Sequence, residues 1–532
     1  MSTTRATNWQ PKEATAPSQQ RLELGSLGIL IATILVFYAL LLRPGVTWAD
    51  DWATYIQNAL NIIHGSTYGD TGYIVNPAAN IGPSAYPPLY PLMLVLPISI
   101  WGVDFDAIRT FHLIGWAAFL VFVYFLSRRR LSFPLSFLLV AAVGLSPYFF
   151  SFKDYITSEV LFLPLLFLTF VVAVRIEERA TNGRAPASAG VSLGLLVALC
   201  IATRSVALIL VPVLAAYDLL RFCRIRYVTI IAMAIGLVAF VLQFMLAGFL
   251  LDYVHGLLSI FVGPGPAAAP NLGSAVGTAQ PAGGLQHALT GLPSLIRERV
   301  GLFAGELSRF WGQGANGDLV ARITSVVFVV LAIYGFAKLR RRTIMHCDVF
   351  AILYGAALLV LPPSLAAARM QMPLAPLFYM YVLFAVRSEP DSKNWIREGV
   401  LAAAVSVGAL SYWHSYRNAD FRVPLDGIEA TDYRDMFDYI RKNTEPNSTI
   451  MFDKPRTLAL FTQRHSAAIY GTRQGDELIW YMQTLRARYV LFYDPWYVVS
   501  RETYVNAYFR DHLNEFEVVH DSGHYVLYKI KT

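Results

Sequence analysis

Eleven stretches of this 532-residue sequence are apolar over roughly 16 to 24 residues, close to the ~20 residues that an α-helix needs to cross a bilayer. They are the segments 24–42, 107–126, 132–147, 158–174, 188–203, 205–220, 227–250, 319–337, 347–363, 371–386 and 398–413. Only 15% of the residues are charged, against about 25% in a soluble domain, so a soluble enzyme would lack the polar surface to cover itself. A mean hydropathy of +0.46 and only 3 cysteines exclude a disordered chain and a disulfide scaffold. The sequence therefore predicts a polytopic α-helical membrane protein.

The basic residues predict how these segments are oriented. A further apolar run, 87–101, is short and rich in proline. If this run lies at the interface without crossing, 19 of the Lys and Arg residues before position 415 fall on the side of the N-terminus and 9 on the other side. Because loops rich in Lys and Arg stay in the cytoplasm, we expect a cytoplasmic N-terminus, an uncleaved first segment, eleven spans and an interfacial helix at 87–101.

This topology divides the chain into three parts. Residues 1–23 form a cytoplasmic tail, 24–414 form the membrane domain with large outer loops at 43–106 and 252–318, and 415–532 form an extracytoplasmic domain. The outer domain carries 15 basic and 16 acidic residues, so the excess of positive charge lies entirely in the membrane half. That distribution indicates how the membrane segments are oriented and argues against a nucleic-acid partner.

Helical and extended patterns alternate in the outer domain. Strands are expected at 448–452, 466–470, 489–493, 516–520 and 525–530, and helices at 432–443, after Pro455, at 476–486 and near 501–513. The alternation predicts a small α/β domain with a mostly parallel sheet and a final hairpin. No GxGxxG or GxxxxGK[ST] motif opens a helix, so no nucleotide site is expected.

The sharpest chemical signal is an acidic pair, Asp50 and Asp51, where the first segment ends and a helical pattern begins. Either residue suits a helix N-terminus, where Asp stabilises the first turn. A carboxylate at the membrane face is equally a candidate general base, and two of them beside Trp52 exceed what a cap needs. The run YPPLYPL at 86–92 follows, and a rigid turn that leads into the interfacial helix explains it well.

Together these motifs resemble those of the GT-C fold membrane glycosyltransferases, and in particular the ArnT-like and protein-O-mannosyltransferase-like group (glycosyltransferase family 39 and relatives). The similar features are the acidic pair after the first span, Tyr55 four residues beyond it, Gly65 closing the helix, and the run at 86–92. The order of the long outer loops and the outer C-terminal domain is also similar over the whole chain.

The resemblance implies a glycosyltransferase of the bacterial plasma membrane. Its donor would be a sugar on polyprenyl phosphate, and its acceptor a glycan, a lipid or a protein. The general base would be Asp51, but many members follow that residue with an acid where this chain has Trp52, so Asp50 is the alternative. The aromatic residues of both motifs would line the substrate, namely Trp52, Tyr55, Tyr86 and Tyr90.

Four more polar residues on the outer side are candidates for the same site. Glu159 resembles the family's second acidic position and would orient the acceptor or assist the base, while Ser158 before it suits a helix cap. Arg369 and Arg204 are lone cations at the outer interface that suit a lipid-linked phosphate, although snorkelling or ion pairing explains each equally well. Lys153 is a third candidate for the phosphate.

The sequence gives little support for a metal or another cofactor. Its histidines do not cluster, and no HxxxH or HExxH pairing is present. Some members of the family use a divalent cation, which keeps a cation as an alternative. In the second outer loop, residues 263–284 are rich in Gly, Ala and Pro, and 289–311 has an amphipathic helical pattern, so this loop is either a gate over the site or an inert linker.

We therefore predict an inverting glycosyltransferase that works at the outer face of the membrane. One alternative is a transporter or flippase for a lipid-linked sugar, which would show inverted repeats and ionisable residues midway through its spans. Another is a non-catalytic cell-envelope assembly protein with 415–532 as its binding module. The sequence contains no evident repeat and its outer charges gather at one face, which favours catalysis there.

Overall fold

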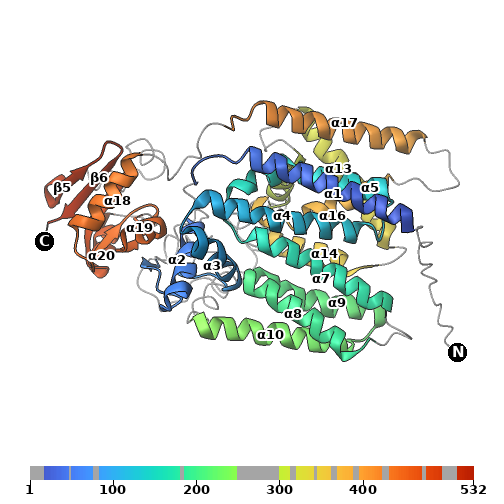
Figure 1. Cartoon of the computed structure of the whole chain (residues 1–532), viewed down its shortest axis with the longest axis horizontal. Coiled ribbons are helices and arrows are strands. Elements are labelled where there is room, and N and C mark those ends of the chain that lie inside the picture. Colours follow the sequence, from blue (N-terminus) through green and yellow to red (C-terminus); the bar gives the residue numbers. More distant parts are fainter. Residues whose placement is uncertain are drawn as a thin grey trace, which may run out of the picture.

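The computed structural model of the chain describes residues 17–46, 50–75, 83–179, 185–247, 297, 299–311, 319–340, 344–360, 368–386, 395–421, 431–469, 475–493 and 512–531. Figure 1 shows a bundle of long, roughly parallel helices with a smaller domain of helices and strands at one end. Helix α1 (Pro17–Leu40) begins at the end of the bundle that is farthest from this domain.

Each of the eleven predicted apolar segments contains helix. After α1 these helices are α4 (Phe105–Ser127), α5 (Phe133–Gly144), α6 (Pro147–Ser151), α7 (Glu159–Arg179), α8 (Ala187–Thr203), α9 (Leu210–Phe222), α10 (Tyr227–Ala247), α13 (Leu319–Arg340), α14 (His346–Val360), α16 (Ala375–Ala385) and α17 (Trp395–Arg417). Large apolar side chains on their outer surface are exposed, among them Ile29, Val238, Val330 and Leu410. An apolar surface of this extent suits contact with lipid.

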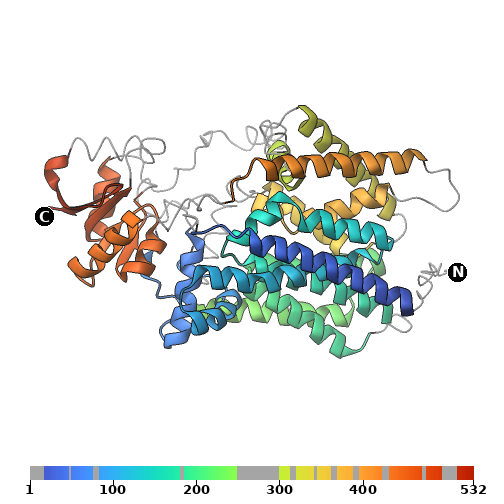
Figure 2. The ribbon, with the colours of Figure 1, turned by 45° about the horizontal axis from the view of Figure 1, so that its top comes forward.

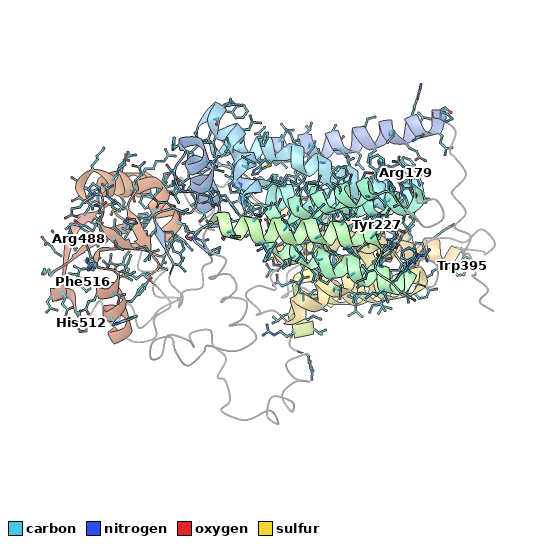
Figure 3. All side chains as sticks on the ribbon, turned by 90° about the horizontal axis from the view of Figure 1, so that it is seen from below. Arg179, Tyr227, Trp395, Arg488, His512 and Phe516 are labelled. Atoms are coloured by element: carbon cyan, nitrogen blue, oxygen red, sulfur yellow. The ribbon has the colours of Figure 1, made fainter. Side chains whose placement is uncertain are left out.

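Within the described residues, α1, α4, α7 and the run Ser205–Phe222 are each long and apolar enough to cross a membrane. A fifth span results if α5 and Pro147–Asp154 are taken together, although they are bent by 46°. Shorter apolar helices complete the bundle, among them α8, α14 and α16. The chain is thus a polytopic helical membrane protein. Figure 3 shows Arg179 and Trp395 at the end of the bundle opposite the domain that contains Arg488.

The described part of segment 43–106, for which we keep the predicted name first outer loop, lies between the bundle and the domain, as Figures 1 and 2 both show. It forms α2 (Asp51–His64), the short strand β1 (Tyr73–Ile74) and α3 (Leu89–Trp101). Helix α2 ends at Gly65, whose φ of 67° gives the left-handed C-cap that glycine adopts without strain. Helix α3 corresponds to the apolar run 87–101 and packs against α2.

The C-terminal domain is built on a six-stranded sheet. Its helices are α18 (Thr431–Asn443), α19 (Pro455–Thr462) and α20 (Gly475–Thr484), and its own strands are β2 (Thr449–Met451), β3 (His465–Ala467), β4 (Ala487–Tyr493), β5 (Phe516–Asp521) and β6 (Tyr525–Ile530). The strand order is β1-β3-β2-β4-β6-β5, parallel from β1 to β4 and antiparallel in the last two pairs. The edge strand β1 comes from the first outer loop, so the sheet is shared by two segments that lie far apart in the sequence.

The described part of the second outer loop packs against the bundle. Its glycine-rich stretch, 263–284, lies outside the described residues, and of 289–311 only 297 and 299–311 are described. Residues 299–308 are helical and continue into a 3₁₀ turn, Arg309–Trp311, in which Phe310 and Trp311 are buried. Two hydrogen bonds join this helix to α15 (Ala368–Gln371): Glu306 accepts from the Ala368 amide, and Gln371 donates to the Phe303 carbonyl.

A glycine allows α4 and α7 to pack closely beside the first outer loop. A Cβ added at Gly115 of α4 would overlap the carbonyl oxygen of Val160 in the first turn of α7. Small residues permit such approaches between membrane helices. Because Val160 follows Glu159, this contact sets the position of that carboxylate relative to the bundle.

Candidate active site

The candidate site begins at the first turn of α2, where Asp51 lies. Its Oδ1 accepts hydrogen bonds from the Tyr86 hydroxyl at 2.6 Å and from Arg456 Nη1 at 3.1 Å, and its Oδ2 accepts one from Arg369 Nη1 at 2.7 Å. The Asp51 side chain is 28% exposed. Donors from three different segments therefore hold a partly open carboxylate in one orientation, and the start of α2 further favours its negative charge.

Arg369 joins Asp51 to a second carboxylate. While its Nη1 donates to Asp51, its Nε and Nη2 donate to the two oxygens of Glu159 in a bidentate pair. Arg204 Nη1 also donates to Glu159, and it bonds Ser158 Oγ at 3.2 Å. We call the chain Asp51–Arg369–Glu159–Arg204 the ionic network. Glu159 is only 3% exposed, and its burial is compatible with a charge because two guanidinium groups pair with it.

Each member of the ionic network stands at a helix end. Glu159 is the first residue of α7. Arg204 follows α8 in an extended conformation, with φ −148° and ψ 124°, before a 3₁₀ turn begins at Ser205. Arg369 lies in α15, the short helix that the second outer loop supports. Side chains from helix ends converge at one end of the bundle, and this arrangement brings together residues about 320 positions apart.

Three tyrosines form a wall beside the ionic network. The rings of Tyr55 and Tyr86 lie 4.5 Å apart, and Tyr90 meets Tyr55 edge to face at 4.7 Å. The Tyr55 hydroxyl lies 3.1 Å from Ser158 Oγ, and the Tyr90 hydroxyl lies 3.2 Å from His112 Nε2. Burial raises the pKa of Tyr86 well above its ordinary value, so this phenol stays protonated and donates to Asp51.

Asp50 faces away from the ionic network and towards the C-terminal domain. Its Oδ1 accepts from the Thr457 amide at 3.0 Å and from the Thr457 hydroxyl at 2.7 Å, and its Oδ2 accepts from the Arg456 amide at 3.2 Å. These amides belong to the first turn of α19, so Asp50 caps that helix from a distant segment. Burial raises the pKa of Asp50, although Arg456 and the Thr457 donors oppose the change.

The environment of Asp51 lowers the pKa of its carboxyl, whereas that of Asp50 raises it. Burial would raise the pKa of its carboxyl, but Arg369, Arg456 and the hydrogen bond from Tyr86 outweigh burial and lower the pKa to about 2. Asp51 is therefore an anion across the physiological range. The sequence left Asp50 and Asp51 as alternatives for one role, and the structure gives them different surroundings.

Two sequence candidates lie elsewhere. Lys153 is fully buried, donates to Asp154 Oδ2 at 2.6 Å and lies over the Phe150 ring; no bond joins it to the ionic network in the described part of the chain. Trp52 packs edge to face against Phe105 and near Phe461 of α19, so it fills the space between α4 and the C-terminal domain. Apart from these two and Asp50, the predicted residues meet in one place, namely Asp51, Tyr55, Tyr86, Tyr90, Glu159, Arg204 and Arg369.

Sequence reasoning missed the contribution of Arg456 and Thr457. The expected helix after Pro455 is present as α19, but nothing in its pattern indicates that its first turn meets the acidic pair. One signal was available, because a helix N-terminus disfavours a basic residue such as Arg456 unless an anion lies nearby.

The donor set does not fit a bound divalent cation. Within the described residues, no three His, Cys, Asp or Glu side chains come together as metal ligands. The two carboxylates that could share an ion, Asp51 and Glu159, are instead bridged by the guanidinium of Arg369. In the described part of the site, a cation of the protein itself thus lies between these two carboxylates.

No protein-family model and no curated protein matches the sequence, but solved structures match the fold. The archaeal oligosaccharyltransferase AglB from Archaeoglobus fulgidus, in complex with an inhibitory peptide and a dolichol-phosphate, matches with a TM-score of 0.55 and 11% identity over 90% of this chain and 70% of its own. ArnT from Cupriavidus metallidurans, bound to undecaprenyl phosphate, matches with a TM-score of 0.52 and 14% identity over 95% of this chain and 98% of its own.

The arabinofuranosyltransferase AftD from Mycobacteria matches with a TM-score of 0.51 and 13% identity; the match covers 95% of this chain and 40% of that larger one. All three similar proteins are membrane glycosyltransferases of one fold, and the matches cover most of this chain. The fold that the resemblance implied is therefore confirmed, and the chain has the GT-C fold of membrane glycosyltransferases.

Proposed function

We propose that this protein transfers a sugar from a polyprenyl-phosphate donor to an acceptor hydroxyl at the outer face of the membrane, with inversion at the anomeric carbon. The observation that carries the proposal is the ionic network, in which an ionised carboxylate lies 2.7 Å from an arginine at the end of an apolar bundle. A base and a phosphate-binding cation are adjacent there, as displacement of a lipid phosphate by a hydroxyl requires. Solved proteins of the same fold are bound to dolichol-phosphate or undecaprenyl phosphate, which supports this class of donor.

In the proposed reaction, Asp51 accepts the proton of the acceptor hydroxyl. The hydroxyl oxygen then attacks the anomeric carbon from the side opposite the phosphate, a new C–O bond forms, and the bond between carbon and phosphate oxygen breaks. The polyprenyl phosphate leaves with the electron pair, and Arg369 and Arg204 stabilise its charge. Glu159 holds both arginines in place, because its Oε1 accepts from Arg204 and Arg369 and its Oε2 accepts from Arg369 as well.

We further propose that the reaction needs no divalent cation, since Arg369 already bridges the two carboxylates and supplies positive charge beside the leaving group. The proposed topology places the C-terminal domain outside, the N-terminus in the cytoplasm, and the protein in a bacterial plasma membrane.

The direct test is a transfer assay in membranes or detergent with a radiolabelled polyprenyl-phosphate sugar. We expect Asp51→Asn to lower the rate by about 10² to 10⁴-fold, the usual contribution of a general base. The control is Asp70→Asn, which removes an exposed carboxylate from the same loop and should leave the rate unchanged. Undiminished transfer by Asp51→Asn would refute the proposed role, and absence of transfer by the wild type with every polyprenyl-phosphate donor would refute the proposed function.

A further inference from the structure

The C-terminal domain reaches the site through two contacts with the first outer loop. Strand β1 pairs in parallel with β3, with Tyr73 opposite Ser466 and Ile74 opposite Ala467. Helix α19 packs on α2, and its first turn lies against the acidic pair. The domain is therefore anchored by a shared sheet on one side of α19 and by hydrogen bonds at the N-terminus of α19.

Asp50 fixes the start of α19. The residue at the N-cap position of this helix, Lys454, makes no capping bond with its side chain. The carboxylate of Asp50 takes over that function by accepting from the Arg456 and Thr457 amides. An acidic group at a helix N-terminus is stabilising, so the bond both orders α19 and holds it to the loop. As a consequence, the side chain of Arg456, in the first turn of α19, is held in one position.

The Arg456 side chain lies beside Asp51, the proposed base. The Arg456 side chain is only 1% exposed, and its guanidinium donates to the Pro83 carbonyl at 2.8 Å, the Tyr86 hydroxyl at 3.1 Å and Asp51 Oδ1 at 3.1 Å. It also lies 5.1 Å from the ring centre of Tyr73. A buried arginine with this many partners has a fixed orientation, unlike a solvated surface side chain.

The two oxygens of Asp51 accept different numbers of hydrogen bonds. A carboxylate oxygen has two lone pairs, and the described residues supply two donors to Oδ1, namely Tyr86 and Arg456. Oδ2 has one described donor, Arg369, and so keeps a lone pair for a substrate proton. The acceptor hydroxyl would meet Asp51 at Oδ2, next to the arginine proposed to bind the leaving phosphate.

We propose that Arg456 is a positioning residue for the general base, supplied by the C-terminal domain, and that with Tyr86 it leaves Oδ2 of Asp51 as the only atom that takes the acceptor proton. This inference rests on the proposed function. It makes the domain a fixed part of the catalytic machinery.

The test compares two buried arginines of the same domain in the full-length protein. Arg456→Gln removes the bond to Asp51, whereas Arg464→Gln removes a guanidinium that bonds only residues of the domain, Thr444, Thr462, Gln463 and Arg441. For Arg456→Gln we expect kcat to fall by about 10 to 10²-fold, as for a displaced catalytic group, with a smaller change in the KM for the lipid-linked donor. The change in kcat and KM in Arg464→Gln measures the effect of losing a buried arginine of the domain that does not bond Asp51.

The pH profile separates positioning from a structural role. The groups that act on Asp51 are Arg369 from α15, Arg456 from α19, Tyr86, Tyr55 and, through Arg369, Glu159. Losing the positive charge of Arg456 raises the pKa of the base. The acid limb of kcat/KM, which lies below about pH 5 in the wild type, should therefore move upward by about one pH unit or more in Arg456→Gln and should not move in Arg464→Gln.

Two results would overturn the inference. If the wild type transfers sugar and Arg456→Gln matches Arg464→Gln in kcat and in its acid limb, Arg456 has no positioning role, and the proposed function stands. If the wild type transfers no sugar from any polyprenyl-phosphate donor, the proposed function fails and the inference fails with it.

Discussion

Asp50 and Asp51 are neighbours whose carboxylates face different parts of the molecule. Asp50 accepts from backbone amides of α19, and Asp51 accepts from Tyr86, Arg456 and Arg369. A carboxylate that accepts from the amides and the threonine hydroxyl of a helix start has a structural role that an uncharged acceptor can partly fill. A partly exposed anion beside an arginine has lone-pair capacity left for a substrate.

The first prediction separates the two residues by what each substitution costs. Asp50→Ala removes the cap of α19 and should destabilise the docked domain by about 1–2 kcal/mol, seen as a lower melting temperature, with a modest loss of kcat. Asp51→Asn should change the melting temperature less and the rate far more. Equal or greater loss of rate in Asp50→Ala, at a temperature where the protein is fully folded, would assign the base to Asp50.

The pKa of Asp51 makes a second prediction for the wild-type protein. Because its folded pKa of about 2 lies below the ordinary value of 3.8 for an aspartate, the ionised carboxylate stabilises the folded site above about pH 4, and that stabilisation is lost as the pH falls towards 2. Transfer rates between pH 5 and 8 should therefore show no acid limb from this base. An acid limb in that range that disappears in Asp51→Glu would contradict the low pKa.

Arg369 makes a third prediction at this scale. Since its guanidinium lies between Asp51 and Glu159, chelation should leave the rate unchanged, and added Mg²⁺ or Mn²⁺ should not increase it. The measurement is transfer after dialysis against EDTA, with a second chelator as the control for direct inhibition. A rate that falls with both chelators and returns with a divalent ion would show that a metal takes part.

At the scale of elements, the sequence patterns predicted the positions of the helices but did not predict the contacts between distant segments. The apolar segments are helical because their length and composition favour burial in lipid, a local property that one sequence contains. Strand β1 is only two residues long and is extended because of its pairing with β3, which lies about 390 positions later. Arg456 was missed for the same reason, since its helix start was predictable and its partner in the first outer loop was not.

The packing of α4 on α7 gives the fourth prediction. Gly115→Ala places a methyl group against the Val160 carbonyl, so one helix must move and Glu159 must move with it. We expect lower thermal stability and a reduced transfer rate. The matched control is Gly408→Ala in α17, where a Cβ meets nothing within 4 Å and the better helix propensity of alanine should stabilise slightly. Equal behaviour of the two variants would show that the α4–α7 contact does not set the site.

For the whole molecule, the proposed function requires that the site and the C-terminal domain lie on the outer side. The structure places the start of α1 and the C-terminal domain at opposite ends of the bundle (Figure 1). In the topology predicted from the sequence, 19 of the basic residues of the membrane half lie on the side of the N-terminus, so the positive-inside rule predicts that this side is cytoplasmic. Under the proposed function, the phosphate of the lipid donor would bind at the end of the bundle that lies next to α19.

The cysteines of the chain allow this polarity to be measured. Cys200 and Cys347 are buried and Cys223 is exposed, in the basic stretch 221–226 that we expect in the cytoplasm. A membrane-impermeant maleimide applied to spheroplasts should label Cys223 only after permeabilisation. In a Cys223→Asn background, which keeps the left-handed backbone there tolerable, a cysteine placed by Asn447→Cys in an exposed turn of the C-terminal domain should label without permeabilisation. The reverse pattern would put the ionic network on the cytoplasmic side and exclude transfer at the outer face, whereas the predicted pattern places Asp51, Arg369 and the docked Arg456 together where an outer-leaflet donor presents its phosphate.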